Sequence, residues 1–242
     1  MTVTADEATP VGDLVRDSLW DKGILRLRLD QTQGMEQLTK TLTEFREWAE
    51  DERATAALIE LLPGRTDWPG LVGIHAVNKW ERALRQWERL DAVTLVTASG
   101  RCTGPAFDLL MAADVRLAAP DLCIALPTGP GGFWPGMAVH RLAHRAGVSR
   151  ARRLILCMAG AGTLEAVQAK ELDVVDEITG ELDDRVAKVL AGCRSGVEAR
   201  LLRGLILDAP GIPFEDALGT HLAACDRALR AAAAGLGTGE ER

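Results

Sequence analysis

The stretch "TLVTASGRCTGPAFD" (residues 94–108) decides the fold, because three structural signals follow one another in it without a gap. It continues the apolar run "VTLVTA" (93–98), which predicts a strand buried on both faces. A glycine-punctuated turn comes next and runs into the start of an expected helix. That helix carries one carboxylate, Asp108, at the end of the quoted stretch. A buried strand that feeds directly into a helix is typical of an α/β fold.

Outward from this stretch, strands and helices alternate over the first two thirds of the chain. "ILRLRL" (24–29) alternates leucine with arginine, which predicts a strand with one wet face. Further strands are predicted from short apolar runs at 56–62, 114–119, 123–126 and 172–178. Helices are predicted from apolar residues at helical spacing at about 38–48, 74–90, 137–159, 163–169, 183–193, 196–208 and 214–234. This order predicts an α/β domain of mostly parallel strands that is closed by helices.

The same pattern predicts three parts of the chain. Residues 1–20 are polar and are expected to form a loose lead-in. Residues 21–195 contain the alternating strands and helices and are expected to form the α/β core. Residues 196–242 carry the helical C-terminal part, in which the final helix places apolar side chains on one face.

Composition limits the classes of function. The 242 residues are 47% hydrophobic and 26% charged, and the net charge of −7 argues against nucleic acid or a membrane surface as partners. The five cysteines are widely spaced and form no CxxC, which argues against a disulfide framework and a zinc site. The N-terminal segment lacks the pattern of a signal peptide, and no stretch approaches the roughly 20 apolar residues of a membrane span. We therefore expect a cytoplasmic protein.

From about residue 92 to residue 178 the order of features resembles the crotonase (enoyl-CoA hydratase/isomerase) superfamily. The likeness is carried by "TLVTASGRCTGPAFDLLMAADVRLAAPDLCIALPT" (94–128), "WPGMAVHRLAHRAGVSRARRLILCMAG" (134–160) and "TLEAVQAKELDVVDEI" (163–178). The resemblance implies a crotonase-type spiral of ββα units with a helical C-terminal part. It also implies that the C-terminal helices make subunit contacts, so that a homotrimer or a hexamer is expected.

Further stretches are similar to a narrower group, the small crotonase-like proteins of 3,5-dihydroxyphenylglycine biosynthesis. These stretches are "KWERALRQWERL" (79–90), "WPGMAVHRL" (134–142) and "FEDALGTHLAACDRALR" (214–230). That pathway makes an aromatic amino acid for glycopeptide antibiotics, and its crotonase-like protein works beside a type III polyketide synthase. The resemblance implies a polyketide substrate presented as a coenzyme A thioester, no separate cofactor, and the synthase as a partner.

The crotonase reaction needs groups that this chain keeps only in part. In the family two backbone N–H groups bind the thioester oxygen, and in hydratases two glutamates move protons. By resemblance Asp108 stands at the first glutamate position and Thr128 at the second, where a hydroxyl cannot titrate near neutral pH. Pro105 stands at one oxyanion-hole position and has no N–H, while Leu71 is a loose candidate for the other. Ordinary hydration of unactivated acyl-CoA is therefore not expected.

A dehydration that ends in an aromatic ring makes smaller demands, because aromatisation drives the elimination. We expect Asp108 to act as the base in such a reaction, with Thr128 and His75 as helpers. The main alternative is a non-catalytic partner that binds the polyketide synthase and stimulates it. A thioesterase on the same scaffold is a third reading.

Several of these residues also have a purely structural interpretation. Asp108 in the first turns of its helix would complement the helix dipole without any catalytic role. Phe133 and Trp134 are expected either to stack on the substrate or to be buried under their glycine-rich loop. His140 and His144 are four residues apart, but a glutamate and a third ligand are missing, so we expect no metal site.

Overall fold

The computed structural model describes residues 12–15, 23–65, 67–129, 132–158, 160, 162–193 and 197–237. Its strands are β1 (Gly12–Val15), β2 (Ile24–Asp30), β3 (Ala56–Leu62), β4 (Val93–Ala98), β5 (Arg101–Cys102), β6 (Val115–Ala118), β7 (Cys123–Ala125), β8 (Thr128–Gly129), β9 (Gly132–Phe133), β10 (Thr163–Glu165) and β11 (Glu177–Ile178). Its helices are α1 (Met35–Asp51), α2 (Ile74–Glu88), α3 (Gly104–Ala112), α4 (Met137–Ala146), α5 (Val148–Arg152), the π-helical η1 (Arg153–Met158), α6 (Ala166–Glu171), α7 (Leu182–Gly192), α8 (Val197–Asp208), the short 3₁₀ turn η3 (Ala209–Gly211) and α9 (Phe214–Gly237).

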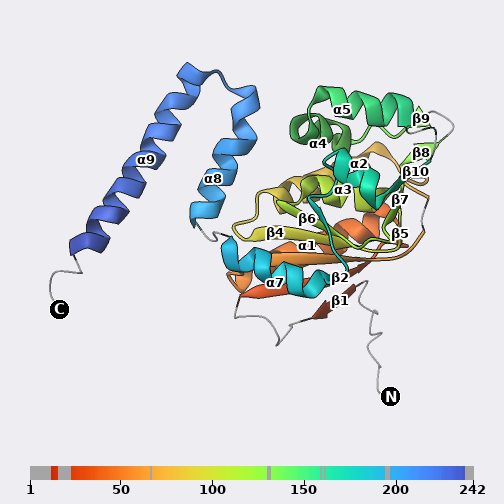
Figure 1. The fold of residues 1–242 in the computed structure, drawn as a ribbon, viewed down its shortest axis with the longest axis horizontal. Coiled ribbons are helices and arrows are strands. Elements are labelled where there is room, and N and C mark those ends of the chain that lie inside the picture. Colours follow the sequence, from red (N-terminus) through yellow and green to blue (C-terminus); the bar gives the residue numbers. More distant parts are fainter. Residues whose placement is uncertain are drawn as a thin grey trace, which may run out of the picture.

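One six-stranded sheet organises the molecule, with the strand order β1-β2-β3-β4-β6-β11 (Figure 1). The five strands from β2 to β11 run parallel, and β1 adds an antiparallel edge. The parallel strands are joined through helices, as parallel pairs require. The chain therefore has the mostly parallel α/β sheet that the sequence predicts.

The two faces of the sheet carry separate apolar cores. Residues such as Leu27, Ile59 and Val96 point to one face, where they pack with apolar residues of α1, α2 and α3. Their neighbours Leu58 and Leu95 point to the other face and pack with residues of α7 (Figure 1). This division follows from the alternation of side chains along a strand. All residues of β3 and β4 are apolar except Glu60 and two threonines. This composition is expected of strands in a sheet that is covered on both faces.

Smaller sheets stand beside the main one and shape the region around α3. A three-stranded sheet has the order β10-β7-β5, and β8 pairs with β9. β5 lies immediately before α3, so the turn that begins this helix is fixed by pairing of Arg101 and Cys102 with β7. All nine residues of α3 are buried.

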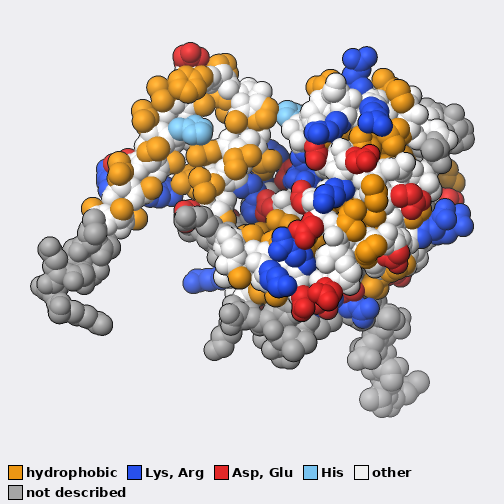
Figure 2. Space-filling view, in the orientation of Figure 1, with side chains coloured by type: hydrophobic (Ala, Val, Ile, Leu, Met, Phe, Trp, Pro, Cys, Tyr) orange, Lys and Arg blue, Asp and Glu red, His pale blue; other side chains and the backbone are white. Residues whose placement is uncertain are grey.

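The C-terminal helices α8 and α9 form a hairpin that stands away from the rest of the molecule (Figure 1). Apolar side chains gather along this hairpin, as Figure 2 shows. They include the exposed residues Phe214, Leu218, Leu222 and Leu229 of α9. The helices expected at 196–208 and 214–234 are thus present.

Some predicted elements differ from the observed ones. Thr163–Glu165, predicted as the start of a helix, forms β10 and pairs antiparallel with β7 before α6 begins. The strand predicted at 172–178 is limited to Glu177–Ile178, because Leu172 and Val174 turn back onto α6 through hydrogen bonds to Gln168 and Ala169. Residues 12–15, expected within a loose lead-in, form β1. The rest of residues 1–20 lies outside the described residues.

Two observations concern membrane-spanning helices and disulfide bonds. None of the helices in the described ranges is both long enough and apolar enough to cross a membrane. Cysteine sulfurs do not pair within the described part of the chain, where all five cysteines are free.

Candidate active site

The turn before α3 brings the candidate site into the core. Gly100 adopts a left-handed φ of 58°, and its N–H donates to Asp121 Oδ1 at 3.2 Å. Thr103 has an extended backbone, and its N–H donates to the side-chain oxygen Oε1 of Gln31 at 2.8 Å. Pro105 in the first turn of α3 has the φ that a helix needs, so the missing N–H costs this helix little. These contacts of the turn therefore fix the position of α3 and of Asp108, which lies on this helix.

Asp108 is the buried acid of this site, with 1% of its surface exposed. Its Oδ2 accepts hydrogen bonds from two indole N–H groups, those of Trp80 at 2.9 Å and Trp68 at 3.1 Å. Oδ1 is also buried and has no hydrogen-bond partner among the described residues. One oxygen of the carboxyl group is thus held by the protein while the other is left unengaged.

Burial controls the ionisation of Asp108. The pKa of this carboxyl group is raised from 3.8 to about 7, chiefly by loss of hydration on burial and to a smaller extent by the negative charge of Glu81. The hydrogen bond from Trp80, the charge of Arg141 and the hydrogen bond from Trp68 each oppose the rise. A carboxyl group with a pKa near 7 can both accept and donate a proton at neutral pH.

Trp68 lies in the loop between β3 and α2 and packs against the first turn of α3. Its indole lies against Gly104 so closely that a Cβ atom at Gly104 would be 2.3 Å from Trp68 Cδ1. Only glycine fits at this position. The first turn of α3 is therefore covered by an indole that also donates to Asp108.

Charged side chains from α2 and α4 form a network close to Asp108. Arg141 pairs with Glu81 at 3.0 Å, and Glu81 also accepts from the Met137 N–H at the start of α4 at 2.9 Å. Arg141 Nε lies 3.6 Å from the buried Glu88. Trp68, Trp80, Glu81 and Arg141 were not candidates from the sequence, and Trp80 lies buried on the apolar stripe of the helix expected at 74–90.

The residues expected to help Asp108 lie elsewhere. His75 is exposed on the first turn of α2, and Thr128 is exposed in β8 with its hydroxyl 3.5 Å from the Leu126 carbonyl. Within the described ranges, no hydrogen bond joins either side chain to Asp108. Leu71, the loose oxyanion-hole candidate, points to solvent with 107% of its reference surface exposed, whereas Pro105 is buried. The roles assigned to these residues stay predictions.

The aromatic residues of the glycine-rich loop pack beside α3. The Phe133 ring meets the ring of Phe107, the neighbour of Asp108 in sequence, edge to face at 5.9 Å between centroids. Trp134 is half-buried and lies against Gly136. Both side chains are partly buried against the core, and their stacking on a substrate stays a prediction.

A cavity of 780 Å³ lies on the far side of the Arg141 network, between α4 and the segment α8–η3. Arg141, His140 and His144 line it together with apolar residues that include Ile206 and Ile212. Asp108 is not part of its wall. Figure 2 shows the crevice between the hairpin and the body, with charged side chains inside it.

No metal cluster supports the histidine pair. The Nε2 atoms of His140 and His144 are 3.0 Å apart. The described part of the chain contains no group of three or more histidine, cysteine, aspartate or glutamate side chains placed to hold a metal ion.

Comparisons with known proteins agree with this architecture. No family model matches the chain. An enoyl-CoA hydratase of Amycolatopsis orientalis is 39% identical over 218 residues, which cover 86% of this chain and 97% of that protein.

Solved structures show the same fold. An enoyl-CoA hydratase/isomerase from Marinobacter aquaeolei superposes with a TM-score of 0.74 at 16% identity and covers 91% of each chain. A Thermobifida fusca protein assigned as an enoyl-CoA hydratase, solved in complex with CoA, gives a TM-score of 0.74 at 18% identity and covers 93% of this chain and 95% of its own. The predicted α/β fold is confirmed by this similarity.

Proposed function

Because the chain belongs to the crotonase (enoyl-CoA hydratase/isomerase) superfamily, we propose that it acts on a coenzyme A thioester and that Asp108 moves the proton in this reaction. The observation that carries the proposal is the buried Asp108 carboxyl group, with one oxygen held by two indoles and a pKa of about 7. A CoA complex of a structural relative supports the substrate class.

The reaction that fits a single carboxyl group is a dehydration. The Asp108 carboxylate takes the proton from the carbon next to the thioester carbonyl, and the electron pair of that C–H bond moves toward the thioester oxygen. The resulting enolate re-forms the carbonyl and expels the β-hydroxyl group. Protonated Asp108 returns its proton to the leaving oxygen, so that water departs and the carboxylate is restored. A pKa near the working pH suits both halves of this cycle.

Aromatisation of a polyketide thioester is the form of this dehydration that the site supports best. The proposed partner is a type III polyketide synthase, and the proposed product is 3,5-dihydroxyphenylacetyl-CoA for glycopeptide antibiotic biosynthesis. Formation of the aromatic ring supplies driving force that the chain's own groups do not supply. This agrees with the exposure of His75 and Thr128, neither of which is hydrogen-bonded to the buried Asp108 in the described part of the chain.

A second candidate function is that of a non-catalytic partner of the synthase. Two observations favour it. Pro105 removes one N–H from the first turn of α3, and the Trp68 indole covers Gly104 in the same turn. A thioester oxygen needs N–H donors at this place, and one lost donor costs roughly 2.7–4 kcal/mol of barrier in enzymes that use such a pair.

The two functions are separated by an experiment with the complete system. A type III polyketide synthase and malonyl-CoA are incubated with wild-type protein, with Asp108→Asn, and with Asp51→Asn as an exposed aspartate control. We expect the wild type and the control to raise the yield of aromatic product, while Asp108→Asn does not. If Asp108→Asn stimulates as strongly as the wild type, the catalytic function is wrong and the partner function is supported.

A further inference from the structure

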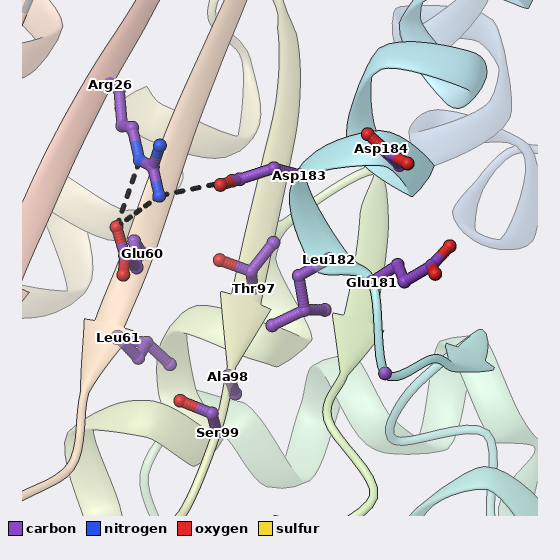
Figure 3. A pocket seen from close by; sticks show the side chains of 11 residues that line it. Arg26, Glu60, Leu61, Thr97, Ala98, Ser99, Glu181, Leu182, Asp183 and Asp184 are labelled. Atoms are coloured by element: carbon purple, nitrogen blue, oxygen red, sulfur yellow. Dashed lines mark hydrogen bonds and ion pairs between the residues drawn. The ribbon is translucent and has the colours of Figure 1, made fainter.

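A second cavity lies on the α7 side of the main sheet, away from the face that packs against α3. It has a volume of 440 Å³, within the range of small-molecule sites, and opens at the carboxyl ends of β3 and β4. Figure 3 shows the side chains from these strands on one side of the cavity and those from the start of α7 on the other. Crevices at the carboxyl ends of parallel strands are common ligand sites in α/β proteins.

Glu60 lines this cavity, and only one of its two carboxylate oxygens accepts hydrogen bonds from the described residues. Arg26 donates from Nε at 3.0 Å and from Nη2 at 2.6 Å, and both bonds reach Oε2 of Glu60. Arg28 Nε also lies closest to Oε2, at 3.4 Å. Among the described residues, no hydrogen bond reaches Oε1. The carboxylate of this cavity-lining residue therefore keeps one oxygen without a donor among the described residues.

Thr97 gives an independent sign that the cavity is built for a ligand. It is the register partner of Glu60 in the neighbouring strand, so the two side chains lie next to each other on one face. Only 4% of Thr97 is exposed, yet its hydroxyl makes no hydrogen bond within the described ranges, and it lines the cavity. The side chain is thus largely enclosed by the protein, while its hydroxyl is left for a group that enters the cavity. Ser99, two residues further along, adds a second hydroxyl to the same wall (Figure 3).

The charged residues around the cavity determine whether a cationic or an anionic ligand is favoured. The lining carries the carboxylates of Glu60, Glu181, Asp183 and Asp184 but a single cation, Arg26. Arg26 is already paired with Glu60 and, at 3.3 Å, with Asp183. A cationic ligand is therefore favoured over an anionic one. In the part of the chain that the structure describes, no three carboxylates converge in the way that a bound metal ion requires.

From this arrangement we propose that the cavity binds a small molecule through its primary ammonium group. An ammonium group has three N–H donors and no acceptor. Oε1 of Glu60 takes one donor in a charge-assisted bond, and the hydroxyl oxygen of Thr97, its neighbour on the adjacent strand, takes another. The acidic residues at the start of α7 attract the cation to the opening. This site is independent of the chemistry at Asp108.

The test uses 1,4-diaminobutane as the probe and isothermal titration calorimetry as the measurement on the full chain. We expect saturable binding to the wild type and none of 1,4-butanediol, which has the same length without the charge. Thr97→Val keeps the shape of a strand residue and removes the hydroxyl, and Glu60→Gln removes the charge. Each variant should weaken binding roughly tenfold or more, since hydrogen bonds to charged groups contribute on this scale. Glu47→Gln, an exposed change on α1, should leave binding unchanged.

Four outcomes would overturn the proposal: no saturable binding of the diamine to the wild type, equal binding to Thr97→Val, equal binding of the diol, or Mg²⁺ competing fully with the diamine. Circular dichroism melting first establishes that each variant folds. Should Glu60→Gln fail to fold, because Arg26 loses its partner, Thr97→Val decides the question by itself.

Discussion

At the scale of single residues, Asp108 is a carboxyl group that the fold retains although burial disfavours its charge. Two indole N–H groups hold one of its oxygens, and the other oxygen has no partner among the described residues. A buried acceptor without a partner lowers stability, typically by about 1–3 kcal/mol. Residues kept at such a cost are often functional, which agrees with a role for Asp108 in proton transfer.

Replacing Asp108 by asparagine is expected to stabilise the protein at high pH. The amide oxygen keeps both indole hydrogen bonds, and the variant carries no charge to bury. Because the folded-state pKa of about 7 lies above the ordinary 3.8, the carboxyl group favours the folded state most below pH 3.8, and this contribution is lost as the pH rises through 7. The stability advantage of Asp108→Asn should therefore shrink by about 2–3 kcal/mol between pH 8 and pH 5.

Urea unfolding of the two proteins at several pH values measures this difference. Asp51→Asn, an exposed aspartate variant, serves as the control and should show no such dependence relative to the wild type. A difference between Asp108→Asn and wild type that stays constant with pH would show that Asp108 does not titrate near 7.

The sequence located Asp108 but not its surroundings. Its position comes from the crotonase-like order of strand, turn and helix. Its hydrogen-bond partners Trp68 and Trp80 lie 40 and 28 residues earlier in the chain, and their approach depends on how α2 and the preceding loop pack onto α3. Spacing along a chain does not encode such contacts. For the same reason the exposure of His75 and Thr128 could not be foreseen.

At the scale of secondary-structure elements, the sequence predicts best where burial alone sets the pattern. β3 and β4 begin and end at the predicted residues, since short continuous apolar runs are typical of parallel strands that are covered on both faces. β10 was missed because Thr163–Glu165 becomes a strand only through its pairing with β7, which is distant in sequence. Short edge elements depend on such tertiary pairing more than on propensity.

The start of α3 offers a prediction about how closely these elements pack. Gly104→Ala would place a Cβ atom 2.3 Å from Trp68 Cδ1, so the indole must move and its bond to Asp108 must lengthen or break. We expect a loss of about 1–3 kcal/mol in the free energy of unfolding and a red shift of tryptophan fluorescence. Gly73→Ala is the matched control, because nothing lies within 4 Å of its Cβ position at the start of α2. Identical effects in both variants would contradict the packing described here.

Helix α8 is attached to the body mainly through Arg203, and this attachment can be tested. The buried Arg203 guanidinium donates to both oxygens of Asp114 and to the carbonyls of Leu90 and Ala92. Arg203→Met would leave Asp114 without its ion-pair partner, and removing one member of a buried pair typically costs about 3–5 kcal/mol.

Hydrogen exchange of α8, together with urea unfolding, measures the consequence. We expect faster exchange in α8 of Arg203→Met. Arg200→Ala removes an exposed ion pair with Asp91 at 3.2 Å and should cost less than about 1 kcal/mol. If the two variants have equal stability, Arg203 does not hold the helix.

At the scale of the whole molecule, the hairpin of α8 and α9 gives the chain an apolar surface that its own body does not cover (Figure 2). Phe214, Leu218, Leu222 and Leu229 recur along one face of α9, and Phe214 is 75% exposed. Contiguous apolar surface of this kind usually marks a protein interface. Such a surface is what subunit contacts through the C-terminal helices would need, and the homotrimer or hexamer stays a prediction from the resemblance.

Sedimentation velocity tests the assembly. We expect wild-type protein to sediment as a trimer or hexamer, and Leu218→Glu combined with Leu222→Glu to sediment as a monomer, since buried charges oppose association. Thr220→Glu adds a charge to the opposite face of α9 and should leave the assembly intact. A monomeric wild type at micromolar concentration would refute the predicted oligomer.

The indole that rests on Gly104 makes Trp68 an internal competitor for any ligand that needs this place. Such a ligand binds only the fraction of molecules in which the indole has moved aside, and its measured dissociation constant equals the intrinsic constant divided by that fraction. Affinity at the first turn of α3 is therefore set by the loop between β3 and α2 as well as by the ligand's own contacts. A partner protein that draws this loop outward would tighten substrate binding without touching the substrate.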